Sequence, residues 1–134
     1  MSSSPVEESV TVELSDTDMT RFIHFSSVVR YFEIGLRRVM EETDLTFRGL
    51  FDRGIGLPIV NVECDYRNAM FYGDELLLEA AVADLSDQTM TLDITLSRDG
   101  TTTAEGTLTT SFYDIEQQEA MAIPDDIRSA LDSL

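Results

Sequence analysis

The alternation of apolar and polar residues along the chain predicts a set of β-strands. A first alternating segment, VTVEL, covers residues 10–14. Four segments with alternating or β-branched character follow further along, at 57–67, 75–85, 89–97 and 101–115. Residue propensity alone also allows a helix at 75–85. The alternating segment at 89–97 needs a partner strand, however, so we favour a strand at 75–85. The pair Asp99-Gly100 predicts a tight hairpin turn between the last two.

Between the first strand and the others, the sequence predicts one long helix. From residue 27 to 42, apolar side chains recur at steps of three and four, at Val28, Val29, Phe32, Leu36, Val39 and Met40. Ser26 or Ser27 is expected to cap its start. Shorter helices are expected at 45–54 and 123–134. This order of elements indicates an α+β fold in which one long helix packs against a mostly antiparallel sheet.

We divide the chain into a flexible N-terminal segment and one folded domain. Residues 1–9 are Ser-rich and acidic, whereas 10–134 carry the periodic patterns. The longest apolar runs fall far short of the ~20 residues of a membrane span, and the start lacks the basic and apolar regions of a signal peptide. We therefore expect a soluble, cytoplasmic protein with no membrane partner. Cys64 is the single cysteine, so we expect a buried, inert thiol and no metal site.

The charge of the chain adds a prediction about its surface. The formal net charge is −17 at pH 7, and all nine basic residues are arginines. Such a surface repels nucleic acids and anionic lipids, because both are bound through a basic footprint. High salt screens the repulsion between acidic groups, so an acidic surface costs a protein little stability at high salt. The same surface keeps the protein soluble under these conditions. The absence of lysine favours a halophilic protein over an ordinary acidic cytosolic one.

Candidate chemistry concentrates in the stretch LSDTDMTRFIHFSS at residues 14–27. The chain has no GxSxG motif, no Gly-rich phosphate loop and no HExxH motif. A lone histidine at the position of His24 is more often a hydrogen-bonded, half-buried imidazole than a base, and a reactive pair with Cys64 requires the fold to join them. Asp18 has two interpretations. Its carboxylate accepts backbone N–H groups in a turn or at a helix start, or it takes part in catalysis.

From about Val10 to Leu131, the chain resembles the hotdog-fold acyl-CoA thioesterases of the 4-hydroxybenzoyl-CoA thioesterase-like family. The resemblance is carried by several short motifs in a specific order. They are Asp16-Thr17-Asp18, the apolar pair Phe22 and Ile23, the helix with Tyr31, Phe32, Glu33 and Arg37, the stretch GIGLPIVNVECDYRNAMFYGDEL, and the closing IPDDIRSAL.

The resemblance implies a hotdog fold, in which the long helix lies against a curved antiparallel sheet, and a site that hydrolyses an acyl-CoA thioester. The family's catalytic carboxylate falls on Asp18, as nucleophile or general base, and the amide that polarises the thioester carbonyl falls near Phe25. We assign His24 and Phe25, at the helix start, as substrate-binding residues. Such a reaction needs a carboxylate and N–H donors for the oxyanion, and no cofactor or metal. The family's sites lie between subunits, so we expect a homodimer or homotetramer.

Two alternatives remain beside the thioesterase. One is a hotdog hydratase that acts on an enoyl thioester, although that branch usually uses an Asp and His pair. The other is a non-catalytic dimer that binds acyl thioesters or proteins, in which Asp18 belongs only to a turn. Phe22, Val28 and Phe32 fit either a pocket for the acyl group or the core, and we favour the core.

Overall fold

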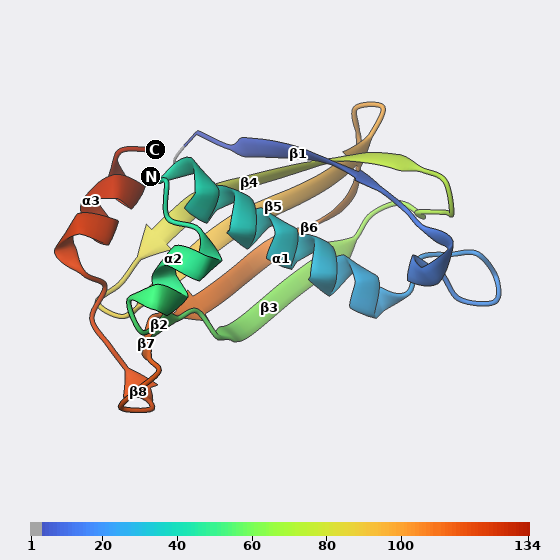
Figure 1. Cartoon of the computed structure of the whole chain (residues 1–134). Coiled ribbons are helices and arrows are strands. Elements are labelled where there is room, and N and C mark those ends of the chain that lie inside the picture. Colours follow the sequence, from blue (N-terminus) through green and yellow to red (C-terminus); the bar gives the residue numbers. More distant parts are fainter. Residues whose placement is uncertain (1–3) are drawn as a thin grey trace.

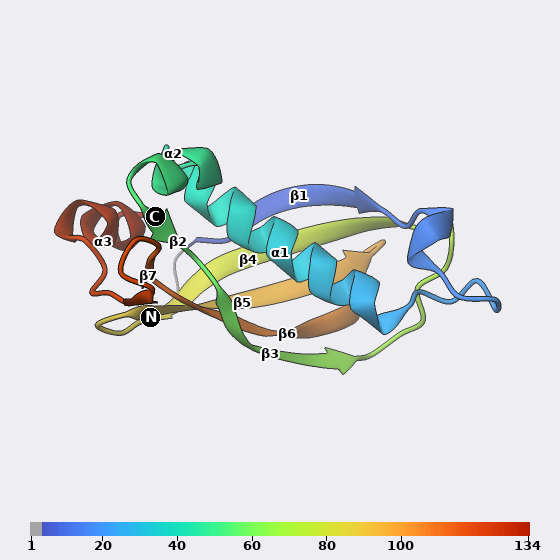
Figure 2. The same cartoon turned by 60° about the horizontal axis from the view of Figure 1, so that its bottom comes forward.

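The computed structural model describes residues 4–134, and its main layer is a five-stranded antiparallel sheet. The strands stand in the order β1-β4-β5-β6-β3. Their bounds are Val6–Thr11 (β1), Ile59–Tyr66 (β3), Glu75–Leu85 (β4), Thr89–Arg98 (β5) and Thr101–Ser111 (β6). The long helix α1 (Phe25–Glu42) crosses one face of this curved sheet, and the described helices leave the opposite face uncovered (Figures 1 and 2). The predicted arrangement of helix and sheet is therefore confirmed.

Much of the core lies between α1 and the strands β4 and β5. Alternation places the apolar residues of β4 and β5 on the face towards the helix, where Leu78 pairs with Leu96 and Ala80 pairs with Ile94. Gly35 allows the helix to come close, because a Cβ at this position would lie 3.2 Å from the side chains of both Ala80 and Ile94. This contact fixes α1 on the sheet and thereby positions the residues at its start.

Smaller elements occupy the two ends of the molecule. A 3₁₀ helix η1 (Leu14–Asp16) precedes α1 at one end (Figure 1). The helices α2 and α3 and a small second sheet gather at the other end (Figure 1). Their bounds are Phe47–Asp52 (α2), Ile55–Gly56 (β2), Tyr113–Asp114 (β7), Glu119–Ala120 (β8) and Asp125–Asp132 (α3). The start of α1 is therefore separated from α2 and α3.

The predicted elements are found, with differences at their boundaries. The hairpin between β5 and β6 turns at Asp99 and Gly100, whose φ angles are 51° and 82°. The helix α1 begins at Phe25, two residues before the predicted start, so neither Ser26 nor Ser27 is its cap. The last strand segment is divided, since β6 ends at Ser111 and β7 pairs with a different sheet.

At the N-terminus, β1 begins at Val6, earlier than the alternating segment at 10–14 predicted. The strand thus includes residues 6–9, which were expected to belong to the flexible segment, while residues 1–3 of that segment lie outside the described part of the chain. The early start follows from pairing with β4, in which Val6 lies opposite Ala80. No helix in the described residues has the length and apolar character needed to cross a bilayer.

Candidate active site

Residues 17–24 connect η1 to the start of α1, and we call them the Asp18 loop. A β-bridge between Thr17 and Ile23 closes the loop as a hairpin. Inside it, the backbone N–H of Asp18 donates to the carbonyl of Phe22 at 3.0 Å. The loop projects from the end of the sheet opposite α2 and α3 (Figure 1). Its hydrogen bonds hold Asp18 in a defined place near the first turn of the long helix.

The carboxylate of Asp18 is exposed and is oriented through one of its two oxygens. Oδ1 accepts from the backbone N–H of Thr20 at 2.8 Å and from the Thr20 hydroxyl at 2.5 Å. In the described part of the chain, Oδ2 accepts no hydrogen bond. The hydroxyl and the N–H of Thr20 hold the pKa of Asp18 below its ordinary value, and His24 adds a smaller lowering. Asp18 is therefore ionised at neutral pH, with one oxygen fixed and the other open to solvent.

These contacts describe a turn rather than a helix cap. The carboxylate accepts from a residue two positions ahead, as Asp side chains do in turns, and it does not reach the N–H groups of α1. The interpretation of Asp18 as a turn residue is thus correct in its local geometry. That geometry leaves Oδ2 free for chemistry, so the two interpretations do not exclude each other.

Asp16 has the opposite environment to Asp18, because it is buried. Its carboxylate accepts from the Tyr31 hydroxyl at 2.7 Å, from the backbone N–H of Glu13 at 2.9 Å, and from the guanidinium of Arg30. Burial raises the pKa of Asp16, but these donors outweigh burial and leave the pKa below its ordinary value. Burial and the bond to Asp16 together raise the pKa of Tyr31 far above its ordinary range. Asp16 is a structural residue that ties η1 to α1.

The main chain of Asp16 also fixes the start of the helix. Its carbonyl accepts from the backbone N–H of His24 at 2.7 Å and from the Ser27 hydroxyl at 3.1 Å. Both donors come from the end of the Asp18 loop or the first turn of α1. The two ends of the Asp18 loop are therefore held together at Asp16.

His24 is the N-cap of α1. Its Nδ1 accepts from the backbone N–H of Ser26 at 3.2 Å and contacts the Ser26 hydroxyl at 2.7 Å. The ring is exposed and stacks on Phe25 with the ring centres 4.7 Å apart. The prediction of a hydrogen-bonded imidazole is confirmed, but the half-buried placement is wrong. A histidine takes the place of the predicted serine cap because its Nδ1 reaches an orphan N–H group of the first turn, that of Ser26.

Phe25 presents a backbone donor as well as an exposed side chain. Within the described residues, the N–H of Phe25 has no hydrogen-bond acceptor, whereas the next two N–H groups both donate to His24. The Phe25 side chain is 67% exposed. A free N–H at the positive end of a helix of 18 residues is a suitable donor for a developing negative charge.

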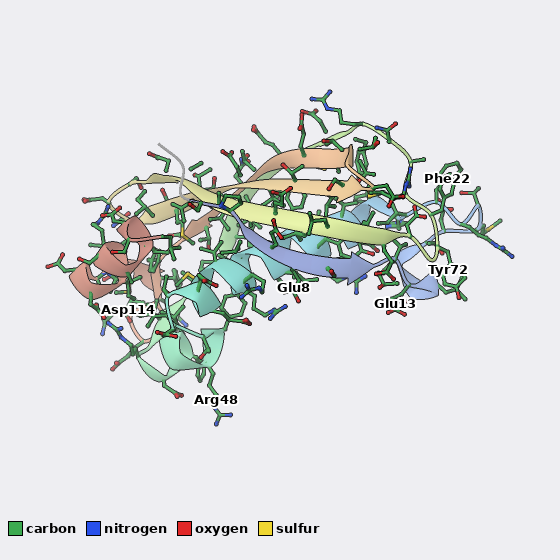
Figure 3. The ribbon with its side chains drawn as sticks, turned by 90° about the horizontal axis from the view of Figure 1, so that it is seen from above. Glu8, Glu13, Phe22, Arg48, Tyr72 and Asp114 are labelled. Carbon is green, nitrogen blue, oxygen red and sulfur yellow. The ribbon has the colours of Figure 1, made fainter. Side chains whose placement is uncertain are left out.

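Aromatic side chains surround the base of the Asp18 loop. Phe22 forms a β-bridge with Phe71, and their ring centres lie 4.9 Å apart. Phe22 and Tyr72 lie together at this end of the molecule (Figure 3). Phe22 is 45% exposed, so its assignment to the core is wrong, while Val28 and Phe32 are buried as predicted. A hollow of about 300 Å³ lies beside the loop, between Phe22 and the end of β3 at Tyr66.

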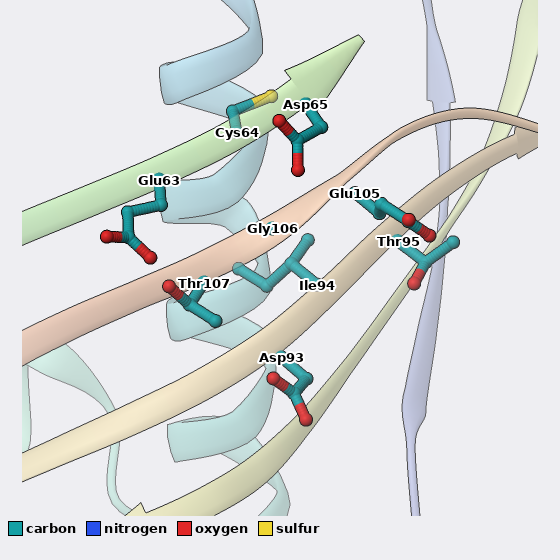
Figure 4. A pocket seen from close by; sticks show the side chains of 9 residues that line it. All are labelled: Glu63, Cys64, Asp65, Asp93, Ile94, Thr95, Glu105, Gly106 and Thr107. Atoms are coloured by element: carbon teal, nitrogen blue, oxygen red, sulfur yellow. The ribbon is translucent and has the colours of Figure 1, made fainter. Parts of the chain in front are cut away.

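A larger hollow, of about 710 Å³, lies on the uncovered face of the sheet (Figure 4). Carboxylates dominate its polar lining, namely Glu63, Asp65, Asp93 and Glu105. It is formed by β3, β5 and β6, on the face of the sheet opposite α1. Because these carboxylates repel anionic ligands, this surface is unsuited to a phosphorylated substrate.

The remaining candidates from the sequence do not join the site. Cys64 is half-buried on β3, and burial raises the pKa of its thiol, which makes it a poor nucleophile at neutral pH. No set of His, Cys, Asp and Glu side chains in the described residues is arranged to hold a metal ion. Sequence reasoning missed Thr20, although the spacing Asp18-Met19-Thr20 is the signal of a carboxylate accepting from the second residue ahead.

A comparison with known families and proteins identifies relatives of the whole chain. The Thioesterase-like superfamily matches residues 12–131. A 1,4-dihydroxy-2-naphthoyl-CoA hydrolase from Synechococcus sp. (strain CC9605) is 28% identical over 134 residues, which cover 95% of this chain and 90% of the relative.

Solved structures resemble the chain over nearly its whole length. A 1,4-dihydroxy-2-naphthoyl-CoA thioesterase from Synechocystis superposes with a TM-score of 0.86 at 17% identity, covering 97% of both chains. A Staphylococcus aureus protein solved in complex with CoA has a TM-score of 0.87 at 14% identity, covering 96% of this chain and 82% of its own. These likenesses confirm the predicted hotdog fold.

Proposed function

The chain belongs to the Thioesterase-like superfamily, and from this premise we propose that it hydrolyses an acyl-CoA thioester with Asp18 as the reacting carboxylate. The observation that carries the proposal is the state of Asp18. Its carboxylate is ionised, held through Oδ1 by Thr20, and free at Oδ2, beside the start of a helix. The other carboxylate of the Asp16-Thr17-Asp18 motif is not available, since Asp16 is buried and both of its oxygens accept hydrogen bonds.

Two routes use this carboxylate. As a nucleophile, Oδ2 attacks the thioester carbon, the C–S bond breaks, and the thiolate leaves while a mixed anhydride forms that water then hydrolyses. As a general base, the carboxylate takes a proton from a water that attacks the same carbon, and the thiolate leaves when the tetrahedral intermediate collapses. Either route ends in a free acid and a thiol.

The oxyanion that develops on the thioester oxygen needs a donor, and the Phe25 N–H supplies it. Its freedom from any acceptor in the described chain supports this role. The positive end of the α1 dipole adds to the stabilisation, because the charge appears only as the reaction proceeds. His24 keeps this amide in place by capping the helix, and its ring with that of Phe25 offers a surface for the substrate.

The relatives suggest which acyl groups to test first. The curated relative acts on 1,4-dihydroxy-2-naphthoyl-CoA, and the exposed rings of Phe22, Phe25 and Tyr72 around the Asp18 loop suit a flat aromatic acyl group. Another relative of the same fold was solved with CoA. We therefore favour an aromatic acyl group carried on CoA.

A second copy of the chain is the expected partner. In the described sheet, β3 is an edge strand that carries the exposed side chains of Val60 and Tyr66, and α1 carries the exposed side chains of Phe25 and Val29. We propose that β3 pairs with its equivalent in a homodimer, with a homotetramer as the larger form. Light scattering should give at least twice the 15.0 kDa chain mass, and an active monomer would contradict this assembly.

Release of free thiol from a panel of acyl-CoAs tests the activity and separates it from its two rivals. The panel should include dihydroxynaphthoyl, hydroxybenzoyl, medium-chain acyl and enoyl thioesters. Steady release of thiol supports the thioesterase. Loss of enoyl absorbance without thiol identifies a hydratase, and binding without either reaction identifies a non-catalytic acyl-thioester protein.

A further inference from the structure

Most arginine side chains of this protein bind a carboxylate or a carbonyl of the same chain. Of the nine arginines, six form ion pairs with carboxylates, and Arg128 donates to the carbonyl of Ser86. Among the described residues, Arg21 and Arg48 are the two arginines with neither kind of partner. The chain contains 26 acidic residues, so an arginine without a carboxylate partner keeps its charge available for another anion.

Arg21 also has an unusual backbone. Its φ is 68°, in the left-handed region that glycine adopts freely and that side chains with a Cβ disfavour. Two hydrogen bonds hold this conformation, because the N–H of Arg21 donates to the Asp18 carbonyl at 3.0 Å and its own carbonyl accepts from the Tyr72 N–H at 3.2 Å. Backbone strain of this kind concentrates at sites of function. The loop therefore fixes the backbone of Arg21, whose guanidinium is unpaired, three residues from the candidate catalytic carboxylate.

We propose that Arg21 binds a phosphate of the CoA carrier and so positions the thioester at Asp18. This inference rests on the proposed thioesterase function. A guanidinium presents a rigid fork of N–H donors that matches the oxygens of a phosphate, and it keeps its charge at any physiological pH. Arg21 is exposed on the Asp18 loop, so a phosphate in solvent can reach its guanidinium.

The other surface features described above are poor alternative binding sites for a CoA phosphate. The large hollow on the open face of the sheet is lined by carboxylates (Figure 4). Arg48, the other unpaired arginine, lies on α2, at the far end of the molecule from Phe22, the neighbour of Arg21 in the chain (Figure 3). Among the described arginines, Arg21 is thus the unpaired one at the end of the molecule where the reaction is proposed.

The substitution Arg21→Asn tests the proposal, because asparagine tolerates a left-handed backbone and carries no charge. At low salt, the KM for an acyl-CoA that the wild type hydrolyses should rise about tenfold, while kcat stays within about twofold. Arg21→Lys, which keeps the charge, should recover part of the loss. At molar KCl the difference between wild type and Arg21→Asn should shrink, since screening weakens the contact with a phosphate.

Two comparisons decide the outcome. With the same acyl group on pantetheine, which has no phosphate, Arg21→Asn should have the KM of the wild type, and Arg48→Asn should match the wild type on both substrates. The proposal is overturned if Arg21→Asn leaves the KM for acyl-CoA unchanged. It is also overturned if Arg21→Asn raises the KM for the acyl-pantetheine as much as that for acyl-CoA, which assigns Arg21 to the acyl group or the loop. An equal rise of the KM in Arg48→Asn overturns it as well. If the wild type itself releases no thiol from any acyl-CoA, the proposed function fails instead.

Discussion

At the scale of single residues, Asp16 and Asp18 differ in burial although they stand two positions apart. Asp16 is 3% exposed, and its three donors include the buried hydroxyl of Tyr31. We expect Asp16→Asn to lower the free energy of unfolding by about 1–3 kcal/mol, because the substitution removes a charge-assisted acceptor from a buried network. Urea unfolding of the two proteins at neutral pH measures this loss.

The pH dependence of that loss has a definite sign. Because the pKa of Asp16 is lowered in the folded protein, its ionised form contributes stability above the ordinary carboxyl pKa, and this contribution disappears as the pH falls through the lowered value. The difference in unfolding free energy between wild type and Asp16→Asn should therefore shrink on acidification. A difference that is absent at neutral pH would show that the network does not stabilise the fold.

The sequence predicts part of this site and misses the rest for physical reasons. The role of Asp18 follows from the resemblance carried by Asp16-Thr17-Asp18. The hydrogen bond from Thr20 to Asp18 is local, so the spacing of the two residues is enough to predict it. The burial of Asp16 is not local, since it depends on the packing of η1 against Tyr31, fifteen residues away in sequence. The left-handed backbone of Arg21 is likewise imposed by the hairpin around it and not by the residue type.

At the scale of elements, periodicity located the strands and the long helix, and tertiary pairing set their ends. The segment 75–85 illustrates this, because its composition allows a helix but its pairing with β1 and β5 makes it a strand. The same pairing extends β1 back to Val6, where no clear alternation exists. The cap of α1 was missed because histidine is an uncommon N-cap, and its role appears only once Asp16 has fixed the backbone of His24.

The contact between β3 and β6 provides a test at this scale. A Cβ at Gly106 would lie 1.8 Å from the backbone carbonyl oxygen of Glu63, a distance that requires the two strands to separate. We expect Gly106→Ala to lower the free energy of unfolding by about 3 kcal/mol or more. Because β3 is the proposed dimer edge, the variant should also dissociate more readily in light scattering.

Gly56→Ala is the matched control for this substitution. A Cβ at Gly56 would lie 3.5 Å from Cγ1 of Ile115, an ordinary contact distance, so the melting temperature should stay close to that of the wild type. Equal stability of the Gly106 and Gly56 variants would mean that the close approach of β3 to β6 is not needed for the fold.

At the scale of the whole molecule, the charge predicts a response to salt. The net charge is −17, and in the part of the chain that the structure describes the ion pairs of the arginines leave most carboxylates without a cation. Added KCl screens the repulsion among these carboxylates, so the melting temperature should rise steadily towards molar KCl. Calorimetric melting in a KCl series measures this rise. A melting temperature that is flat or falls would remove the interpretation as a halophilic protein.

The central claim is that Asp18 carries out thioester hydrolysis, and steady-state thiol release by Asp18→Asn tests it most directly. Asparagine keeps an oxygen that accepts from Thr20, so the melting temperature should barely change. The amide neither attacks a thioester nor takes a proton from water, so turnover should fall by about 10²–10⁴-fold. Asp114→Asn, which alters a carboxylate that accepts from the N–H of Gln117 at the other end of the molecule (Figure 3), should keep wild-type turnover. Wild-type turnover in Asp18→Asn would contradict the account.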